Sequence, residues 1–408
     1  MAENAPESSV GWLDHSAKDS QRMRELISAF RDRQSIDNLG IGIVRDSISE
    51  QLFPGISTIQ TRARYFFFVP WLCQRLEGER VSSADFSRRY RALETALIDR
   101  LVKTGEVNGV IGYQARDGLK RLAIEVYWGG LGAYGIRRVA GSVSEYRRGL
   151  GSLYRHRSAD NRDDDGNAVG PVLATWDTVL PVPPQDFYEH VDLALTEDEA
   201  AYLVNSIRRS QPGTLVASLA GRDSSLFDEP DIWHLPDNAF PEGQRDLIRH
   251  AQLFAVAAQP ARALYNLLLA RRRSDHPLAP SVEAKAEEEL EQWRSDRLPL
   301  LPALDDWVAK LDDFWKLADP DHSIPSPRKG SIARLVGMCH AHAEDLEQTA
   351  ALHREIEETE RKLKGPLARL TPGRARDTWT GQAFGTGYLD YRWRPAMRIL
   401  GDIGKALA

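Results

Sequence analysis

The densest group of side chains able to do chemistry lies in residues 33–71 of this 408-residue chain. Asp37 stands before a glycine-bearing turn, where the absence of side chains lets a ligand approach the backbone. Asp46 and Glu50 are spaced to share one face of a helix. If both carboxylates were buried there, the pKa of one would rise, which is the arrangement that acid–base chemistry needs.

The same stretch offers groups that bind anions. The turn FPGIS, residues 53–57, is expected to lead directly into a helix, whose free amides near Ser57 would bind phosphate. Hydrogen-bond donors and a stacking ring follow at Gln60, Thr61, Arg62, Arg64 and Tyr65. A structural alternative stays open: Asp37 can cap a helix, the arginines can form internal ion pairs, and Tyr65 can belong to the core.

Charge is segregated along the chain, although the net charge is only −6. Residues 60–157 hold 18 basic and 9 acidic side chains, whereas residues 158–242 hold 4 basic and 17 acidic ones. Residues 361–398 are basic again, with 9 basic and 2 acidic side chains. Arginines interleaved with aromatic rings, as at Arg392 and Trp393, suit nucleic acid because Arg binds phosphate and stacks on bases. Solvated helix faces, or an acidic segment that neutralises the basic ones, explain the pattern equally well.

Helices must position these residues, because apolar residues recur at helical spacing along most of the chain. Helices are expected over residues 16–30, 41–52, 57–76, 82–103, 196–209, 242–273, 281–296, 302–317, 330–345, 346–364 and 393–406. Strand signals are confined to 122–128 and 176–182. The predicted fold class is mainly α, with two helical lobes separated by an acidic, loop-rich insertion and at most a few short strands.

Three segments are expected: an N-terminal helical lobe (1–157), the acidic insertion (158–242) and a C-terminal helical lobe with a basic tail (243–408). A hydrophobic share of 42% and a charged share of 27% are typical of a soluble globular protein. The longest uncharged apolar run, 65–72, is too short to span a bilayer. With no signal-peptide pattern and only two cysteines, the expected location is the cytoplasm, with no membrane partner.

Three motifs are present only in part. GLGAYG at 130–135 matches a dinucleotide-binding string, but no repeating βαβ pattern surrounds it. Residues 161–172 resemble a calcium loop that ends in Val172 where a glutamate is required. MCHAH at 338–342 lacks the second cluster that a tetrahedral zinc site needs. No cofactor and no metal are therefore predicted.

A helix, the FPGIS turn and a second helix with arginines and aromatic rings resemble the helix-hairpin-helix element of DNA glycosylases and other DNA-binding proteins. The usual hairpin has a second glycine where this chain has Ser57. In those glycosylases a catalytic Asp follows the hairpin. The corresponding window here contains Glu77 and Glu79, with Asp85 slightly beyond it, and none stands in a matching motif.

Nearly the whole chain also resembles a bacterial family long carried as a domain of unknown function. The matching pieces are WLDHS (12–16), DNLGIGIVRD (37–46), FPGISTIQTRARYFFFVPW (53–71), YWGGLGAYGIRR (127–138), ALYNLLLARR (263–272) and LDYRW (389–393). Its members look like standalone antiphage factors. The resemblance implies a DNA glycosylase that removes hypermodified cytosines, such as glucosylated hydroxymethylcytosine, from phage DNA.

Such an enzyme flips a base and stabilises an oxocarbenium-like sugar with a carboxylate. The catalytic carboxylates expected first are Asp37 and Asp46, followed by Asp14, Asp85 and Asp390. The DNA- and base-binding residues expected are Asn38, Ser57, Gln60, Arg62, Arg64, Tyr65, Arg392 and Trp393, with Trp128 as a third aromatic and Asn266 as a further pocket donor. Because 33–71 contains no lysine, a monofunctional glycosylase that leaves an abasic site is favoured over a lyase.

Other functions fit parts of the pattern. A non-catalytic module that binds phage DNA or a phage protein explains the helices and the clustered arginines equally well. A metal-dependent nuclease would gather several carboxylates, but the acidic loop at 160–165 has no partner motif. A dinucleotide enzyme is the least supported alternative.

Overall fold

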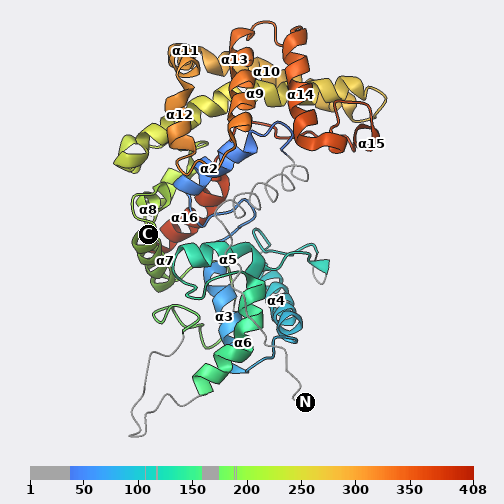
Figure 1. Cartoon of the computed structure of the whole chain (residues 1–408). Coiled ribbons are helices and arrows are strands. Elements are labelled where there is room, and N and C mark those ends of the chain that lie inside the picture. Colours follow the sequence, from blue (N-terminus) through green and yellow to red (C-terminus); the bar gives the residue numbers. More distant parts are fainter. Residues whose placement is uncertain (1–36, 106, 116–117, 159–173, 188, 190) are drawn as a thin grey trace, which may run out of the picture. The chain divides into compact units, whose positions relative to one another are not determined.

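The computed structural model describes residues 37–105, 107–115, 118–158, 174–187, 189 and 191–408. This part of the chain is mainly helical, which confirms the prediction of a mainly α fold (Figure 1). The α-helices are α2 (Gly42–Leu52), α3 (Tyr65–Gly78), α4 (Phe86–Lys103), α5 (Ala123–Ala133), α6 (Val143–Ser158), α7 (Glu197–Ser210), α8 (Leu215–Leu219), α9 (Arg245–Arg272), α10 (Ala279–Arg297), α11 (Leu301–Ala309), α12 (Leu311–Ala318), α13 (Ser326–Ala341), α14 (Ala350–Lys364), α15 (Arg374–Asp377) and α16 (Trp393–Leu407). The 3-10 helices are η2 (Ser224–Asp228), η3 (Ile232–His234), η4 (Asp237–Ala239), η5 (Glu242–Gln244), η6 (Leu298–Leu300) and η7 (Gly365–Leu367).

Some predictions fall on other parts of the chain. The helix expected over 16–30, the carboxylate of Asp14 and the calcium-like loop at 161–172 lie outside the described residues.

Two segments predicted as strands are not strands. Residues 122–128 lead into α5, which is buried almost all round, so its apolar residues show no amphipathic period. Glu125 closes the first turn of α5 by accepting a hydrogen bond from the N-cap backbone N–H (3.2 Å). Within 176–182, Trp176 forms an isolated antiparallel bridge with Arg137. Pro181 lacks the N–H group that a longer ladder requires.

Helices with clear local signals are confirmed. The helix predicted over 41–52 is α2. At the start of α7, Thr196 and Glu199 form the predicted capping box, with reciprocal hydrogen bonds of 3.2 and 3.0 Å. The single helix expected over 302–317 is instead α11 and α12, because Lys310 leaves the helical conformation (φ −127°, ψ 45°).

The prediction of a helix that starts near Ser57 is wrong. Residues 53–64 form turns, and α3 begins at Tyr65. The Gln60 amide holds the turn by accepting from the Ser57 N–H (3.2 Å) and donating to the Gly55 carbonyl (3.1 Å). The Ser57 amide is therefore occupied within the turn and is not part of a helical phosphate site.

Side chains from distant segments hold the next residues out of a helix. The Tyr127 hydroxyl accepts from the backbone N–H of Thr61 (2.9 Å) and of Arg62 (3.0 Å). The Asp402 carboxylate of α16 accepts from the N–H of Ala63 (2.9 Å). These amides point at side chains and not at the carbonyls of a preceding turn, so the backbone does not form a helix here.

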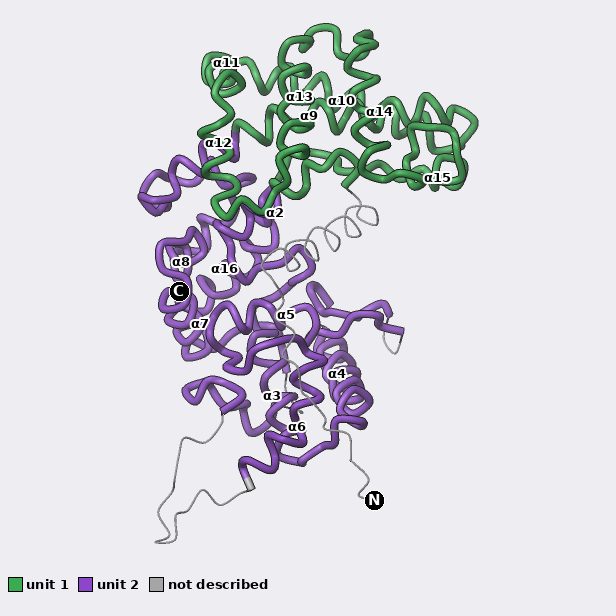
Figure 2. The backbone as a smooth tube through the Cα atoms, in the orientation of Figure 1, with its two compact units in different colours: residues 1–44, 253–389 green, residues 45–252, 390–408 purple. Residues whose placement is uncertain are grey.

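The chain divides into two compact units (Figure 2). Unit 1 comprises residues 1–44 and 253–389, and unit 2 comprises residues 45–252 and 390–408. The divisions fall inside α2 and α9. They are not at the positions after residues 157 and 242 where the change in charge placed the predicted boundaries.

Helix α3 lies at the core of unit 2, where α4 and α5 pack against it and α16 packs against α7. The acidic segment contributes to this core, since Leu203 of α7 is fully buried. Its carboxylates also pair with the basic block. Arg64 of the segment before α3 is buried and forms ion pairs with Asp192 and with Glu199 (3.2 Å). The acidic residues thus neutralise arginines within the fold, which is one of the alternatives raised by the sequence.

The carboxyl-terminal part of α9 lies at the core of unit 1. The Trp293 indole of α10 donates to the Val256 carbonyl (2.8 Å), and the Phe254 ring stacks on Phe314 of α12 (5.0 Å between centroids). The helical stretch 242–272 is long and apolar enough to cross a membrane by composition alone, but 94% of its apolar window is buried. That burial is typical of the core helix of a soluble protein.

Candidate functional site: a pocket in unit 1

A pocket in unit 1 brings together two of the predicted site residues, Asp37 and Asn38. Its other lining residues are Leu39, Arg262, Tyr265, Phe384 and Gly385. The cavity volume is about 40 Å³, and the hollow opens to solvent. This is space for a few water molecules, so a base-sized ligand would enter only if the wall of the pocket moved. A carboxylate, an amide, a guanidinium group and aromatic rings therefore converge on one hollow.

Asp37 organises the loop on one side of this pocket. Its Oδ1 accepts from the backbone N–H of Gly40 (2.9 Å) and of Leu39 (3.3 Å), and its Oδ2 accepts from the N–H of Gly42 (2.7 Å). Gly40 has φ 78°, a conformation that favours glycine. These bonds fix both carboxylate oxygens and hold the start of α2.

Asn38 lines the pocket and carries a buried hydrogen-bond donor. The residue is 4% exposed, and its Nδ2 has no acceptor among the described residues. Its Oδ1 accepts from Arg369 Nη1 (3.3 Å). A buried donor without a partner is costly unless a ligand or water meets it.

A loop on the opposite side carries Phe384. The Asn266 amide of α9 donates to the Phe384 carbonyl (2.9 Å) and accepts from its N–H (2.8 Å). Arg262 donates to the Gly387 carbonyl (2.8 Å), and Gly385 and Gly387 adopt positive φ values of 60° and 70°. Asn266, predicted as a pocket donor, thus positions the aromatic ring through both ends of its amide.

A buried carboxylate supports the pocket from behind. Glu360 of α14 accepts from the Tyr265 hydroxyl (2.6 Å) and from the backbone N–H groups of Arg369 (2.9 Å) and Leu370 (2.8 Å). Burial raises the pKa of Tyr265 well above its usual value, so the phenol stays protonated and donates. The Tyr265 and Phe384 rings meet edge to face, with centroids 6.1 Å apart.

One guanidinium group lines the pocket, and two more lie against residues in or next to its lining. Arg262 lies in its wall, and Arg369 lies over the Phe384 ring with 4.6 Å between Cζ and the ring centroid. Arg328 of α13 packs so closely on Gly40 that an added Cβ would lie 2.6 Å from its Nη1. This grouping of positive charge beside an aromatic wall suits an anionic, ring-bearing ligand.

The other predicted carboxylate is placed elsewhere. Asp46 does not line this pocket and belongs to unit 2. Its side chain is half exposed and pairs with its neighbour Arg45 (2.8 Å). Glu50, predicted to share its helical face, is also exposed and pairs with Arg392 (2.6 Å). The predicted acid–base pair requires that the two carboxylates be buried together, and they are not.

The predicted DNA-binding arginines of unit 2 are engaged within that unit. Arg62 bonds the Asp402 carboxylate at 2.9 and 3.1 Å, and Arg64 is buried against acidic side chains. Arg392 donates to the Ile56 carbonyl (2.7 Å) as well as to Glu50. The oxygen and the nitrogen of the Gln60 amide both form hydrogen bonds with the 53–57 turn. The structural alternative raised in the sequence analysis accounts for these contacts.

The three predicted stacking aromatics lie in the core of unit 2. Tyr65 and Trp393 are at most 1% exposed, and Trp128 is 7% exposed. Their polar atoms are occupied: the Tyr65 hydroxyl accepts from the Ile111 N–H (2.9 Å), and the Trp393 indole donates to the Glu229 carbonyl (2.8 Å). Stacking on a base would require these rings to leave the core, so we do not retain them as DNA-binding residues.

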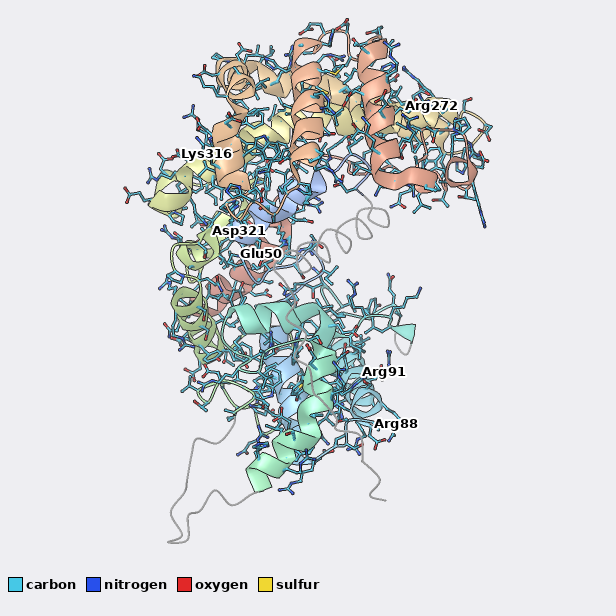
Figure 3. The ribbon with its side chains drawn as sticks, viewed as in Figure 1. Glu50, Arg88, Arg91, Arg272, Lys316 and Asp321 are labelled. Atoms are coloured by element: carbon cyan, nitrogen blue, oxygen red, sulfur yellow. The ribbon has the colours of Figure 1, made fainter. Side chains whose placement is uncertain are left out.

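Other basic residues of unit 2 lie at or near its surface. Arg88 of α4 is exposed and pairs with Asp85 (2.8 Å), while Arg91 is half-buried (Figure 3). Arg91 donates to the Leu119 carbonyl (2.8 Å), which places Lys120 and Arg121 beside α4. Arg147 of α6 donates to Ser87 of α4 (2.6 Å) and brings Arg148 to the same region. We call this set the α4–α6 basic surface; its members are Arg88, Arg91, Lys120, Arg121, Arg147 and Arg148.

The cysteine–histidine cluster of α13 has ordinary partners. Cys339 is buried, and burial raises the pKa of its thiol to about 12. His340 contacts Asp305 (2.8 Å) and His342 contacts Asp345 (3.5 Å). Among the described residues, no group of three or more His, Cys, Asp or Glu side chains is arranged to hold a metal ion.

Sequence reasoning missed most of the pocket wall. Arg262, Tyr265 and Phe384 lie far from Asp37 in the chain, and each has a common structural use in a helix or loop. A signal was present in the segment ALYNLLLARR, which contains Tyr265 and was among the pieces that carried the family resemblance.

Comparison with known proteins places the chain in a family without assigning an activity. No curated protein and no solved structure shows a significant match. A family model matches residues 7–407, which is nearly the whole chain. The protein therefore belongs to DUF6361, a family of unknown function.

Proposed function

We propose that this protein is an antiphage DNA glycosylase that takes a flipped base into the pocket of unit 1. The observation that carries the proposal is the convergence there of an oriented carboxylate, a buried amide donor and an aromatic ring, bordered by three arginines. These are the groups that bind a sugar cation, a base edge and a base face. The resemblance described above supplies the target class, a glucosylated hydroxymethylcytosine in phage DNA. The low cysteine content suits the reducing cytoplasm as the place of action.

Asp37 is the carboxylate proposed to act. As the N-glycosidic bond breaks, positive charge develops on the sugar, and an oxygen of Asp37 stabilises it. Three backbone N–H bonds hold these oxygens before the reaction, so no reorganisation is needed at that moment. Water then adds to the sugar and leaves an abasic site. The lining residues include no lysine, which supports hydrolysis over a lyase reaction.

The arginines are proposed to hold the DNA backbone next to the flipped nucleotide. A flipped base brings its own phosphates toward the mouth of the pocket, and guanidinium groups bind phosphate oxygens in pairs. Arg262 and Arg328 are the residues that we assign to this role. Arg369 has a different role, because it bonds Asn38 and lies over the Phe384 ring.

The test is an assay on phage DNA that carries glucosylated hydroxymethylcytosine, against the same sequence with cytosine. Products are treated with an abasic-site endonuclease and resolved on a denaturing gel, while released base is followed by mass spectrometry. The proposal expects strand cleavage only after the endonuclease, together with free modified base. Cleavage without the endonuclease would point to a nuclease or a lyase.

Substitution of the two predicted carboxylates identifies the one that acts. Asp37→Asn is expected to slow base release by on the order of 10²-fold or more, because an amide does not stabilise a cation as a carboxylate does. Asp46→Asn, on an exposed side chain outside the pocket, is expected to retain release. If Asp37→Asn and Asp46→Asn slow base release equally, with unchanged melting temperatures, Asp37 is not the acting group.

One observation favours the alternative of a binding module without chemistry. Both oxygens of Asp37 accept from backbone N–H groups of its own loop, as they would in a purely structural cap. In a binding module, Asp37→Asn would weaken DNA binding and lower the melting temperature together, and no DNA would yield free base. In the enzyme, a glycosylase defect is expected to exceed any binding defect.

A further inference from the structure

The amide of Asn38 is the most unusual polar group of the pocket. It is more than nine-tenths buried, it lines the hollow, and its nitrogen has no acceptor among the described residues. A buried N–H without a partner costs about 1–3 kcal/mol, so proteins rarely keep one that has no use. An acceptor on a ligand would remove this cost.

The orientation of that amide is fixed by Arg369. Its Nη1 donates to Asn38 Oδ1 (3.3 Å), and a guanidinium group carries donors only. If the amide flipped, two donors would face each other. Arg369 is itself held in place, since its guanidinium lies over the Phe384 ring (4.6 Å) and its backbone N–H donates to Glu360 (2.9 Å). The bond to Arg369 therefore fixes the orientation of the Asn38 amide, one of the side chains that line the pocket.

We infer that Asn38 determines which base the pocket accepts, by donating to N3 of a cytosine-class base and rejecting a uracil-class base. Cytosine and uracil both carry an acceptor at O2, but N3 is an acceptor in cytosine and an N–H donor in uracil. A fixed donor at this position forms a hydrogen bond with N3 of a cytosine-class base and meets another donor at N3 of a uracil-class base. The inference rests on the proposed function in taking the ligand to be a flipped base, and it names the chemistry by which that base is read.

The expected discrimination is large. A site built to form a hydrogen bond rejects an analogue that cannot form it far more strongly than a hydrophobic pocket rejects a missing methylene. We expect the wild-type protein to prefer the cytosine-class base by on the order of 10²-fold or more.

The experiment uses two duplexes that differ only in one base, glucosylated hydroxymethylcytosine or glucosylated hydroxymethyluracil. Base release gives kcat/KM for each duplex, and fluorescence anisotropy gives the binding affinity without relying on catalysis. In Asn38→Asp, one carboxylate oxygen still accepts from Arg369 while the other faces the pocket as an acceptor, so the preference is expected to reverse toward the uracil-class base. The control is Asn205→Asp, the same chemical change on an exposed residue of α7, which is expected to keep the wild-type preference.

Two further variants keep the inference testable if Asn38→Asp does not fold. Asn38→Ala removes the donor and is expected to bind both duplexes with similar affinity. Arg369→Gln releases the orientation of the amide, because Gln can accept as well as donate, and is expected to lose most of the discrimination. Arg369→Lys keeps a donor-only group and is expected to retain the discrimination between the two duplexes. A merely structural role of Arg369 would not produce this difference between the Gln and Lys variants.

The outcomes separate this inference from the proposed function. Equal kcat/KM and equal affinity of the wild type for both duplexes, or an unchanged preference in Asn38→Asp and Asn38→Ala, would overturn the role of Asn38 and leave the glycosylase intact. If neither duplex releases base, the proposed function fails. A binding preference for the cytosine-class duplex that disappears in Asn38→Ala would then still support the recognition by Asn38.

Discussion

At the scale of single residues, the buried carboxyl group of Glu94 in α4 should make stability depend on pH. Burial raises its pKa to about 7, against the lowering effect of a hydrogen bond from the Ala123 N–H (2.8 Å). The folded protein keeps this proton up to about pH 7, whereas the unfolded chain releases it above about pH 4.5. Unfolding therefore releases a proton between these values, and this group's contribution to stability is lost as the pH rises through that window.

Replacing Glu94 with Gln should remove that loss. We expect Glu94→Gln to gain stability relative to the wild type between pH 4.5 and pH 8.5, by up to about 3 kcal/mol, since one pKa unit corresponds to about 1.4 kcal/mol. Differential scanning calorimetry of both proteins at the two pH values measures the effect. A difference in melting temperature that does not grow with pH would contradict this account of Glu94.

At the scale of elements, the close contact between α5 and the 53–57 turn depends on a glycine. A Cβ added to Gly130 would lie 2.5 Å from the Gly55 carbonyl oxygen and 2.9 Å from the Phe66 ring, so the turn would have to move. Gly130→Ala is expected to destabilise the protein by about 1–3 kcal/mol, as overpacking does.

The neighbouring glycine of the same helix provides the matched control. A Cβ at Gly129 would meet nothing within 4 Å, so Gly129→Ala is expected to be neutral or to stabilise by up to about 1 kcal/mol through helix propensity. Urea unfolding of both variants measures the two free energies. If Gly129→Ala and Gly130→Ala lower the free energy of unfolding by similar amounts, the contact with the turn is not the cause. The helix would then exclude side chains here for another reason.

The elements also show what the sequence can predict. The capping box at Thr196 and the helix over 41–52 follow from signals within a few residues, and both are confirmed. The 53–64 turns could not be predicted, because the groups that hold them, Tyr127 and Asp402, are distant in the chain. In the same way, Asp37 and Asn38 stood out locally, whereas the α9 and Phe384 walls of their pocket become neighbours only in the fold.

At the scale of the whole molecule, the segregated charge is partly cancelled and partly exposed. Arg64, Arg138 and Arg157 pair with carboxylates inside unit 2, which accounts for some of the excess of basic residues in 60–157. Most of the α4–α6 basic surface remains exposed, as Arg88 illustrates, while Arg91 and Arg147 are half-buried (Figure 3). A protein with a net charge of −6 can therefore still bind DNA through a local surface, because phosphates respond to nearby charge when salt screens distant charge.

The salt dependence of DNA binding tests this hypothesis. If the α4–α6 basic surface binds the DNA backbone, the double variant Arg121→Gln/Arg148→Gln should bind unmodified DNA more weakly. The slope of log Kd against log salt should fall by up to about 0.9 for each phosphate that the variant no longer neutralises. Anisotropy titrations between low and moderate salt give the slope.

The control is Lys310→Gln/Lys316→Gln in unit 1, which removes two exposed cations that already pair with Asp306 and Asp313. Equal changes of slope in the two double variants would mean that the DNA responds to total charge, and that the α4–α6 basic surface is not a defined binding surface.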